Sequence, residues 1–202
     1  MTYFIRVPER LTEYEWLRDN GLDFKALLLW CHLFYCCSRN GESWFTVGET
    51  LKLVGTGRSV KKVNEIIMAM ERFKYDGLID YDEDLTKVSD DRHVTVRINE
   101  IFFKGNWKFV QMPVESFRKI RKCEKEIPGD VMIAVYLHVL KNTLDDGWCY
   151  LSKERIDREL KLRNGTSSKC LEILAKEKLL RKKVIKNSVT GKKQFLYKKT
   201  EN

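Results

Sequence analysis

The sequence is poor in proline and contains no long apolar run. Only 3 of its 202 residues are proline, and no stretch is of low complexity. No apolar run approaches the roughly 18 residues that a membrane-spanning helix needs, so we expect no membrane partner. The opening MTYFIRVPER lacks the basic region and apolar core of a secretory signal. We therefore expect a cytoplasmic protein.

Patterns typical of metal sites and enzymes are also missing. The 6 cysteines are scattered without a CxxC pair, and a reducing compartment would keep them as thiols. His32 and Cys36 stand one helical turn apart, but their apolar segment offers no further ligands, so core packing is the better interpretation. The chain has no GxxxxGK[ST] phosphate loop and no nucleophile elbow. We expect no cofactor, no metal and no catalytic activity.

Charge is distributed unevenly along the chain. The net charge is +9, but residues 1–103 carry 14 Lys and Arg against 17 Asp and Glu, a net of −3. Residues 104–202 carry 24 against 12, a net of +12. A strongly basic half beside a slightly acidic half indicates that one half meets a polyanion. The alternative interpretation is that lysine only keeps the surface hydrated.

The chain repeats itself at a spacing of about 105 residues. Four pairs of segments match in order: FIRVP (Phe4–Pro8) with FVQMP (Phe109–Pro113), LLLWCHLF with IAVYLHVL, GESWFT with GWCYLS, and AMERFKYDGLI with CLEILAKEKLL. Four ordered matches indicate two copies of one fold. A glycine and an asparagine interrupt the pattern near residues 99–106. We therefore expect two domains, residues 1–103 and 104–202.

Each copy predicts the same order of elements. A short strand ends at a proline, which favours an extended residue before it. An apolar helix follows, over Phe24–Ser38 or Asp130–Asn142, and a second helix begins at the N-cap residue Thr46 or Ser152. A third helix and a β-hairpin complete each copy. The sequence thus predicts a mainly α fold with small β wings, in the α+β class.

The third helix of the first copy carries apolar residues at helical spacing. The side predicted to face the core consists of Val60, Val63, Ile67 and Met70. Gly77 follows this helix at the position where a glycine commonly ends a helix.

This order of elements is that of a winged helix-turn-helix domain. More narrowly, the sequence resembles the winged-helix domains of replication initiators of bacterial plasmids and phages and of related primosomal proteins. Three short motifs carry the resemblance. F-x-x-(V/I/M)-P matches Phe4–Pro8 and Phe109–Pro113, and G-L-I matches Gly77–Ile79. The motif (F/L)-(T/S)-x-x-x-(I/L) matches Leu151–Ile156, and Phe45–Leu51 follows it with one additional residue. The second copy departs from these patterns in two places. Lys178–Leu180 has no glycine where the first copy has G-L-I, and Arg155 stands at the third position of the second helix, where a capping box has a glutamate.

The tandem arrangement is similar to the iteron-binding plasmid initiators, in which one domain supports dimerisation and the other is the main reader of DNA. The resemblance therefore implies two tandem winged helix-turn-helix domains that bind double-stranded DNA and initiate replication. It also implies a homodimer through the N-terminal domain and contacts with replication-machinery proteins. A transcriptional regulator of the same architecture remains an alternative, and so does an interaction module that binds proteins without DNA.

The two predicted hairpins differ in charge. The first holds the acids Asp80, Asp82, Glu83, Asp84, Asp90 and Asp91. The second holds only cations among its charged residues before Glu201. Cations close to phosphates displace counterions and so add salt-dependent affinity. The second copy is therefore predicted to be the main DNA reader.

The candidate DNA contacts lie on three elements of the second copy. The start of the second helix offers cations that could hold the DNA phosphate backbone. The third helix and the turn before it would approach base edges or phosphates in the major groove, and the hairpin would hold phosphates. Small polar residues at the start of the third helix could also bind phosphate through free backbone N–H groups. In chain order the candidates are Lys153, Arg155, Arg163, Asn164, Thr166, Ser168, Lys169, Arg181, Lys182, Lys183, Lys186, Lys192 and Lys193. Auxiliary contacts in the first copy would come from Arg58, Lys61 and Lys62. The alternative is a core helix with a hydrated outer face.

Overall fold

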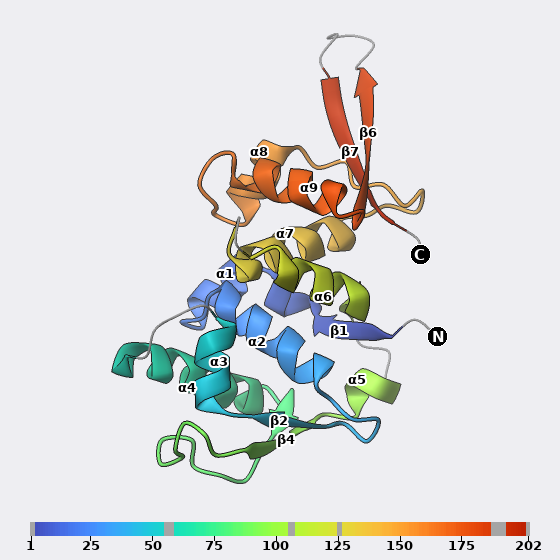
Figure 1. Ribbon diagram of the computed structural model, residues 1–202. Coiled ribbons are helices and arrows are strands. Elements are labelled where there is room, and N and C mark those ends of the chain that lie inside the picture. The colour runs from blue at the N-terminus through green and yellow to red at the C-terminus, as the bar shows by residue number, and fades with distance from the viewer. Residues whose placement is uncertain (1–2, 55–58, 105–107, 125–126, 187–192, 201–202) are drawn as a thin grey trace.

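The computed structural model describes residues 3–54, 59–104, 108–124, 127–186 and 193–200, and within them helices alternate with small antiparallel sheets (Figure 1). This mixed α/β architecture agrees with the predicted α+β class. None of the helices in these ranges is long and apolar enough to cross a membrane.

The first half of the chain begins with a strand and ends with a short helix. Its elements are β1 (Phe4–Pro8), a 3-10 turn (Glu9–Thr12), α1 (Tyr14–Asp19), α2 (Phe24–Tyr35), β2 (Glu42–Phe45), α3 (Val47–Leu53), α4 (Val60–Tyr75), β3 (Ile79–Asp80), β4 (Val94–Ile98) and α5 (Ile101–Lys104). The three strands β2, β4 and β3 form one sheet in that order. The domain boundary predicted between residues 103 and 104 falls inside α5.

The second half follows a similar order. Its elements are β5 (Phe109–Pro113), α6 (Val114–Lys122), α7 (Gly129–Lys141), α8 (Lys153–Glu159), α9 (Thr166–Lys176), β6 (Leu180–Lys186) and β7 (Lys193–Lys199). Strands β6 and β7 form a hairpin that stands out from the body (Figure 1). In place of β2, the second half has a single bridge residue, Cys149, whose N–H donates to the Tyr197 carbonyl at 2.8 Å.

The first strands of the two halves pair with each other. Strand β1 runs antiparallel to β5, so that Phe4 lies opposite Pro113 and Pro8 lies opposite Phe109. The matching segments FIRVP and FVQMP therefore meet in a symmetric register. Helix α2 packs against α7, its counterpart in the second half. The two halves consequently share one sheet and one continuous hydrophobic core.

Side-chain caps fix where several helices begin. The Thr46 hydroxyl accepts from the Glu49 N–H at 3.1 Å at the start of α3, and the Ser152 hydroxyl accepts from the Arg155 N–H at 3.2 Å at the start of α8. Both residues satisfy a backbone donor that the helix itself leaves without a partner. The two N-caps predicted from the sequence are thus confirmed.

The core-facing side of α4 agrees with the predicted one only in part. Met70 is fully buried and Val63 and Ile67 are half-buried against the core, as predicted, whereas Val60, the first residue of the helix, is 79% exposed. The other buried residues of α4 are Ile66, Ala69 and Phe73, which were not in the predicted set. The helical periodicity was therefore right, and the buried face is centred to one side of the predicted one.

The ends of α4 and α9 adopt the same backbone geometry with different residues. Gly77 has a φ of 67° after α4, and Lys178 has a φ of 58° after α9. The following residue donates back in each case, Leu78 N–H to the Phe73 carbonyl and Leu179 N–H to the Leu174 carbonyl, both at 2.9 Å. This six-to-one bond is the Schellman helix ending. The missing glycine at Lys178 therefore leaves the ending intact but puts a lysine in the left-handed region.

Candidate nucleic-acid interface

The β6–β7 hairpin is a two-stranded ribbon with cations on both of its faces. Its strands pair from Leu180 opposite Lys199 to Lys186 opposite Lys193. Successive residues of a strand point to opposite faces, so Lys182 and Lys186 share one face while Arg181 and Lys183 share the other. All four, and Lys193, are exposed. The connecting residues 187–192, which include Lys192, lie outside the described part of the chain.

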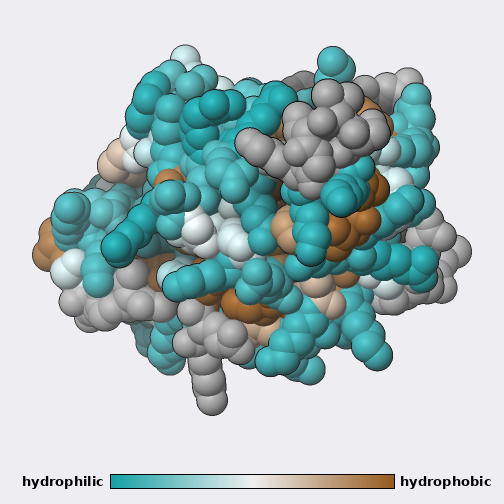
Figure 2. Space-filling view, turned by 90° about the horizontal axis from the view of Figure 1, so that it is seen from above, coloured by the Kyte–Doolittle hydropathy of each residue, from teal (hydrophilic) through white to brown (hydrophobic). Residues whose placement is uncertain are grey.

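These five cations (Arg181, Lys182, Lys183, Lys186 and Lys193), here called the hairpin cations, have no carboxylate partner in the part of the chain that the structure describes. Within the described residues, none of them forms an ion pair. Positive charges held close together on a thin ribbon produce a positive electrostatic potential, which favours the binding of an external anion. Figure 2 shows the molecule from the side on which the hairpin stands, and hydrophilic residues cover most of this face.

The predicted hairpin of the first half, between β3 and β4, carries acids of which several pair with its own cations. The Arg97 guanidinium lies 2.9 Å from an Asp80 oxygen and 3.1 Å from an Asp82 oxygen. Its hydrogen bond lowers the pKa of Asp80, and the Lys87 ammonium together with Thr86 lowers the pKa of Asp84 to about 2. Acids that stay ionised on this surface repel phosphate. The contrast in charge between the two predicted hairpins is therefore present in the structure.

Phe195 connects the hairpin to the two helices beside it. The Lys182 ammonium lies 4.5 Å from the centre of the Phe195 ring, and the Lys153 ammonium lies 4.8 Å from it. Both distances suit a cation–π contact. Lys153 stands at the start of α8 and also donates to the Ser168 hydroxyl of α9 at 2.8 Å. Three candidate DNA contacts, Lys153, Ser168 and Lys182, thus belong to one surface.

Lys153 is less available to a DNA phosphate than an unpaired lysine would be. Its side chain is 19% exposed, and its ammonium lies 3.7 Å from a Glu172 carboxylate oxygen in addition to its bond to Ser168. Arg155 is more open, with 54% of its side chain exposed, but it donates to Glu159 at 2.6 Å. Lys153 therefore links α8 to α9 and to the hairpin, whereas Arg155 is an exposed cation that pairs with Glu159 of its own helix.

The turn between α8 and α9 is closed by a buried aspartate that the sequence did not single out. The Asp157 carboxylate accepts from the Gly165 N–H at 2.7 Å and from the Ser167 N–H at 2.8 Å. The Ser167 hydroxyl in turn donates to the Lys153 carbonyl at 2.8 Å. Gly165 has a φ of 85°, a conformation that suits glycine. The only signal in the sequence is an acid that precedes a Gly-Thr-Ser turn by less than ten residues.

This cap corrects one of our expectations. We expected free backbone N–H groups at the start of α9 to bind phosphate, but Asp157 occupies two of them and the Arg163 carbonyl accepts from the Thr166 N–H at 3.0 Å. A carboxylate already fills the favourable end of the helix dipole. Most of the N–H groups at this end are therefore taken, and a phosphate there would be held mainly by side chains.

The remaining candidates on this part of the chain are available to a ligand. Arg163, Asn164 and Lys169 are exposed, while Thr166 and Ser168 are half-buried. Lys176, one more exposed cation of α9, was not among the predicted residues. The exposed Glu172 also belongs to this helix. Helix α9 thus offers a mixed polar face, and the hairpin supplies most of its neighbouring positive charge.

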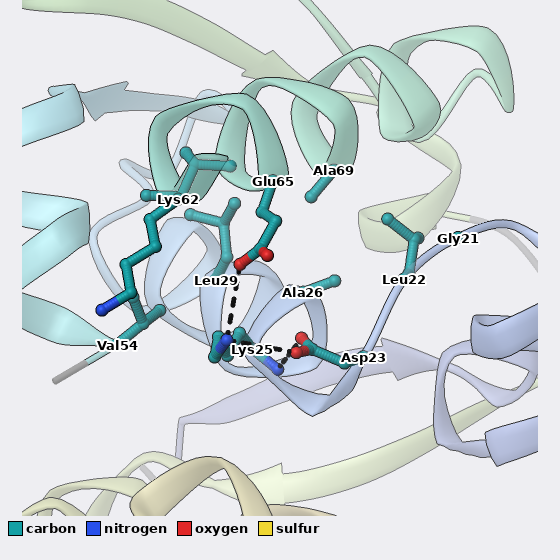
Figure 3. Close-up of a pocket in the computed structure, with 11 residues that line it drawn as sticks. Gly21, Leu22, Asp23, Lys25, Ala26, Leu29, Val54, Lys62, Glu65 and Ala69 are labelled. Carbon is teal, nitrogen blue, oxygen red and sulfur yellow. Dashed lines mark hydrogen bonds and ion pairs between the residues drawn. The ribbon is translucent and has the colours of Figure 1, made fainter. Parts of the chain in front are cut away.

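The auxiliary residues of the first half do not form a comparable surface. Arg58 lies outside the described residues, and Lys61 is exposed at the start of α4. Lys62 is half-buried and lines a cavity of about 130 Å³ between α2 and α4 (Figure 3). Inside this cavity Lys25 pairs with Asp23 at 3.3 Å and with Glu65 at 3.5 Å.

The histidine and cysteine noted in the sequence are in contact. Cys36 Sγ lies 3.7 Å from His32 Nε2, burial raises the pKa of the Cys36 thiol, and burial lowers the pKa of His32. Across the described ranges, no group of three or more His, Cys, Asp or Glu side chains is arranged to hold a metal ion.

Comparison with known proteins adds no relative to this picture. The chain matches no protein-family profile and no curated protein sequence. Function is therefore inferred from the geometry and charge of the surface formed by α8, α9 and the hairpin.

Proposed function

We propose that the protein binds double-stranded DNA through its second half, with α9 directed into the major groove and the β6–β7 hairpin lying along the phosphate backbone. The observation that carries this proposal is the set of hairpin cations, exposed and without carboxylate partners among the described residues. Lys182 of this set contacts Phe195, which also contacts Lys153, and Lys153 donates to Ser168 of α9. A helix beside a basic two-stranded ribbon is how winged-helix domains meet duplex DNA.

Two kinds of contact contribute to binding in this arrangement. The hairpin cations supply affinity that does not depend on sequence and weakens as salt rises. Arg163, Asn164 and Lys169, exposed at the start of α9, supply contacts to base edges or to flanking phosphates. Since Asp157 accepts from two of the N–H groups at this helix end, side chains carry most of the recognition.

The repeated order of elements supports a tandem pair of winged helices, of which the first has a different task. Its acidic surface disfavours phosphate, and the outer side of its α4 carries Val60, Met68 and Tyr75, all exposed. We assign to this half the contact with protein partners, either a second copy of the chain or components of a replication machinery. Initiation of replication on a plasmid, phage or other mobile element is the role that the resemblance favours.

Hydrogen exchange on a complex with mixed-sequence duplex DNA tests the assignment of the two halves. The proposal predicts slower exchange in α9 and in β6–β7 and unchanged exchange in α4 and β4. Protection confined to α4, or none at any protein concentration in low salt, would refute it. A transcriptional regulator would show the same protection, so deletion of the gene from its replicon, followed by a replication assay, separates the two roles.

A further inference from the structure

A groove that the proposed function leaves unused opens where β1, α5 and α6 meet, on the side of the molecule that carries the N-terminus (Figure 1). Its volume is about 680 Å³. Three arginines line it, Arg6, Arg39 and Arg118, and the described residues that line it include no Asp or Glu. The groove is thus a local basic site at the border of the acidic half.

The arginines differ in how they are held. The Arg6 guanidinium donates to the Phe102 carbonyl and lies 5.0 Å from the centre of the Phe109 ring. Arg118 donates from Nε to the Tyr35 hydroxyl at 3.1 Å and keeps 54% of its side chain exposed, with a Glu115 oxygen 3.8 Å away. Arg39 is exposed and has no partner among the described residues. Two positions are therefore fixed, and a third cation is free to meet a ligand.

Aromatic rings supply the rest of the groove wall. Tyr3 is 62% exposed and Tyr35 is 36% exposed. Phe34 and Phe103 stack on each other with ring centres 5.4 Å apart and an angle of 21° between the planes. Exposed rings beside arginines form a platform on which planar bases stack while the cations hold phosphates.

The groove adjoins the base of the hairpin at one contact. Lys199, the last residue of β7, places its ammonium 5.0 Å from the centre of the Phe4 ring, and Phe4 lines the groove. Lys199 lies opposite Leu180, where β6 begins. One cation at the base of the hairpin therefore lies beside the aromatic groove.

We propose that this groove binds a single strand of nucleic acid, with bases stacked on Tyr3 and Tyr35 and phosphates held by Arg39 and Arg118. A duplex keeps its bases stacked inside, so only a single strand can use exposed rings in this way. An acidic peptide would use the arginines but gain little from the two tyrosines. The proposal goes beyond duplex binding and does not depend on it.

The first test measures the affinity of a fluorescent oligo(dT) of about 12 nucleotides, a length within the range that single-strand sites cover. Tyr3→Ala combined with Arg39→Ala removes an exposed ring and a free cation and should weaken binding about tenfold or more. The matched control, Tyr75→Ala combined with Arg18→Ala, removes the same kinds of side chain at exposed positions outside the groove, and it should bind within about twofold of the natural chain. Equal affinity of the double variant and the natural chain would overturn the proposal.

The second test locates the strand. Ultraviolet cross-linking of oligo(dT) is carried out on a chain with Lys182→Ala, Lys183→Ala and Lys193→Ala, so that the hairpin holds less of the strand. Cross-links at Tyr3, Phe4 or Tyr35 support the groove whether or not the hairpin binds duplex DNA. Cross-links found only at Trp148, Tyr150 or Phe195, or a peptide of Glu and Tyr that binds as tightly as the oligonucleotide, would overturn it.

Discussion

Lys153 and Ser168, both predicted to touch DNA, are bonded to each other: the ammonium donates to the hydroxyl at 2.8 Å and ties the start of α8 to α9. The same ammonium lies over the Phe195 ring, so one side chain joins both helices to the hairpin. This relationship makes the surface a connected unit. It also means that Lys153 contributes to stability as well as to charge.

Replacing Lys153 by Ala should therefore lower the free energy of unfolding by about 1 kcal/mol, since it removes a charge-assisted hydrogen bond and a cation–π contact at a partly exposed site. Urea titration measures the change. Lys169→Ala removes the same charge from an exposed position on α9 and should stay within about 0.5 kcal/mol of the natural chain. Equal effects of the two substitutions would show that Lys153 is only a surface charge.

Asp157 should matter more for the fold than any predicted DNA contact. Asp157→Ala leaves the N–H groups of Gly165 and Ser167 without partners, and we expect a loss of about 2–3 kcal/mol in unfolding free energy. Glu154→Ala, at an exposed position of the same helix, is the control and should change little. An Asp157→Ala variant as stable as this control would contradict the assignment of Asp157 as the cap.

The two helix endings allow a reciprocal test of backbone strain. Lys178→Gly relieves a left-handed lysine and should raise the unfolding free energy by about 0.5–1 kcal/mol. Gly77→Ala introduces the strain at the matching position and should lower stability by about 1 kcal/mol. A Cβ at Gly77 would meet no atom within 4 Å, so packing cannot account for the loss. Thermal unfolding of both variants checks the opposite signs.

These endings illustrate what the sequence could and could not predict. Local signals worked: the N-caps at Thr46 and Ser152 and the end of a helix at Gly77 depend on residues only a few positions apart. The buried face of α4 was predicted only in part because its pattern contains apolar residues on two sides, and only the tertiary core decides between them.

Long-range relationships lay beyond the local pattern. The register of β1 on β5 joins segments about 105 residues apart, and matching sequences do not reveal that the copies pair with each other. At the candidate interface, composition predicted which hairpin is basic, because charge is read directly from the residues. The bonds of Lys153 and Asp157 depend on which helix lies beside which, so the sequence predicted only a DNA contact for Lys153 and no role for Asp157.

Stability should fall as the solution becomes mildly acidic. Burial lowers the pKa of His32, and burial lowers that of His138 despite its bond to Glu159. Because the folded state keeps these histidines neutral, the unfolded chain binds protons first as the pH falls. The free energy of unfolding therefore decreases below about pH 6.5, the ordinary pKa of histidine. Urea titrations between about pH 7.5 and pH 5 should show this decline, and His32→Gln with His138→Gln should flatten it. A decline of equal slope in the double variant would exclude both histidines as its source.

Binding of phosphate by the hairpin is tested by the salt dependence of duplex affinity for two matched triple variants. One variant carries Lys182→Ala, Lys183→Ala and Lys193→Ala in the hairpin, and the other carries Arg18→Ala, Lys52→Ala and Lys87→Ala at exposed positions of the first half. Both lose three positive charges, so a general effect of net charge would act on them alike. If the hairpin holds phosphates, the slope of log affinity against log salt falls by about 2–3 for the hairpin variant and stays unchanged for the other. Equal slopes for the two variants, or a smaller slope only for the first-half variant, would contradict the account.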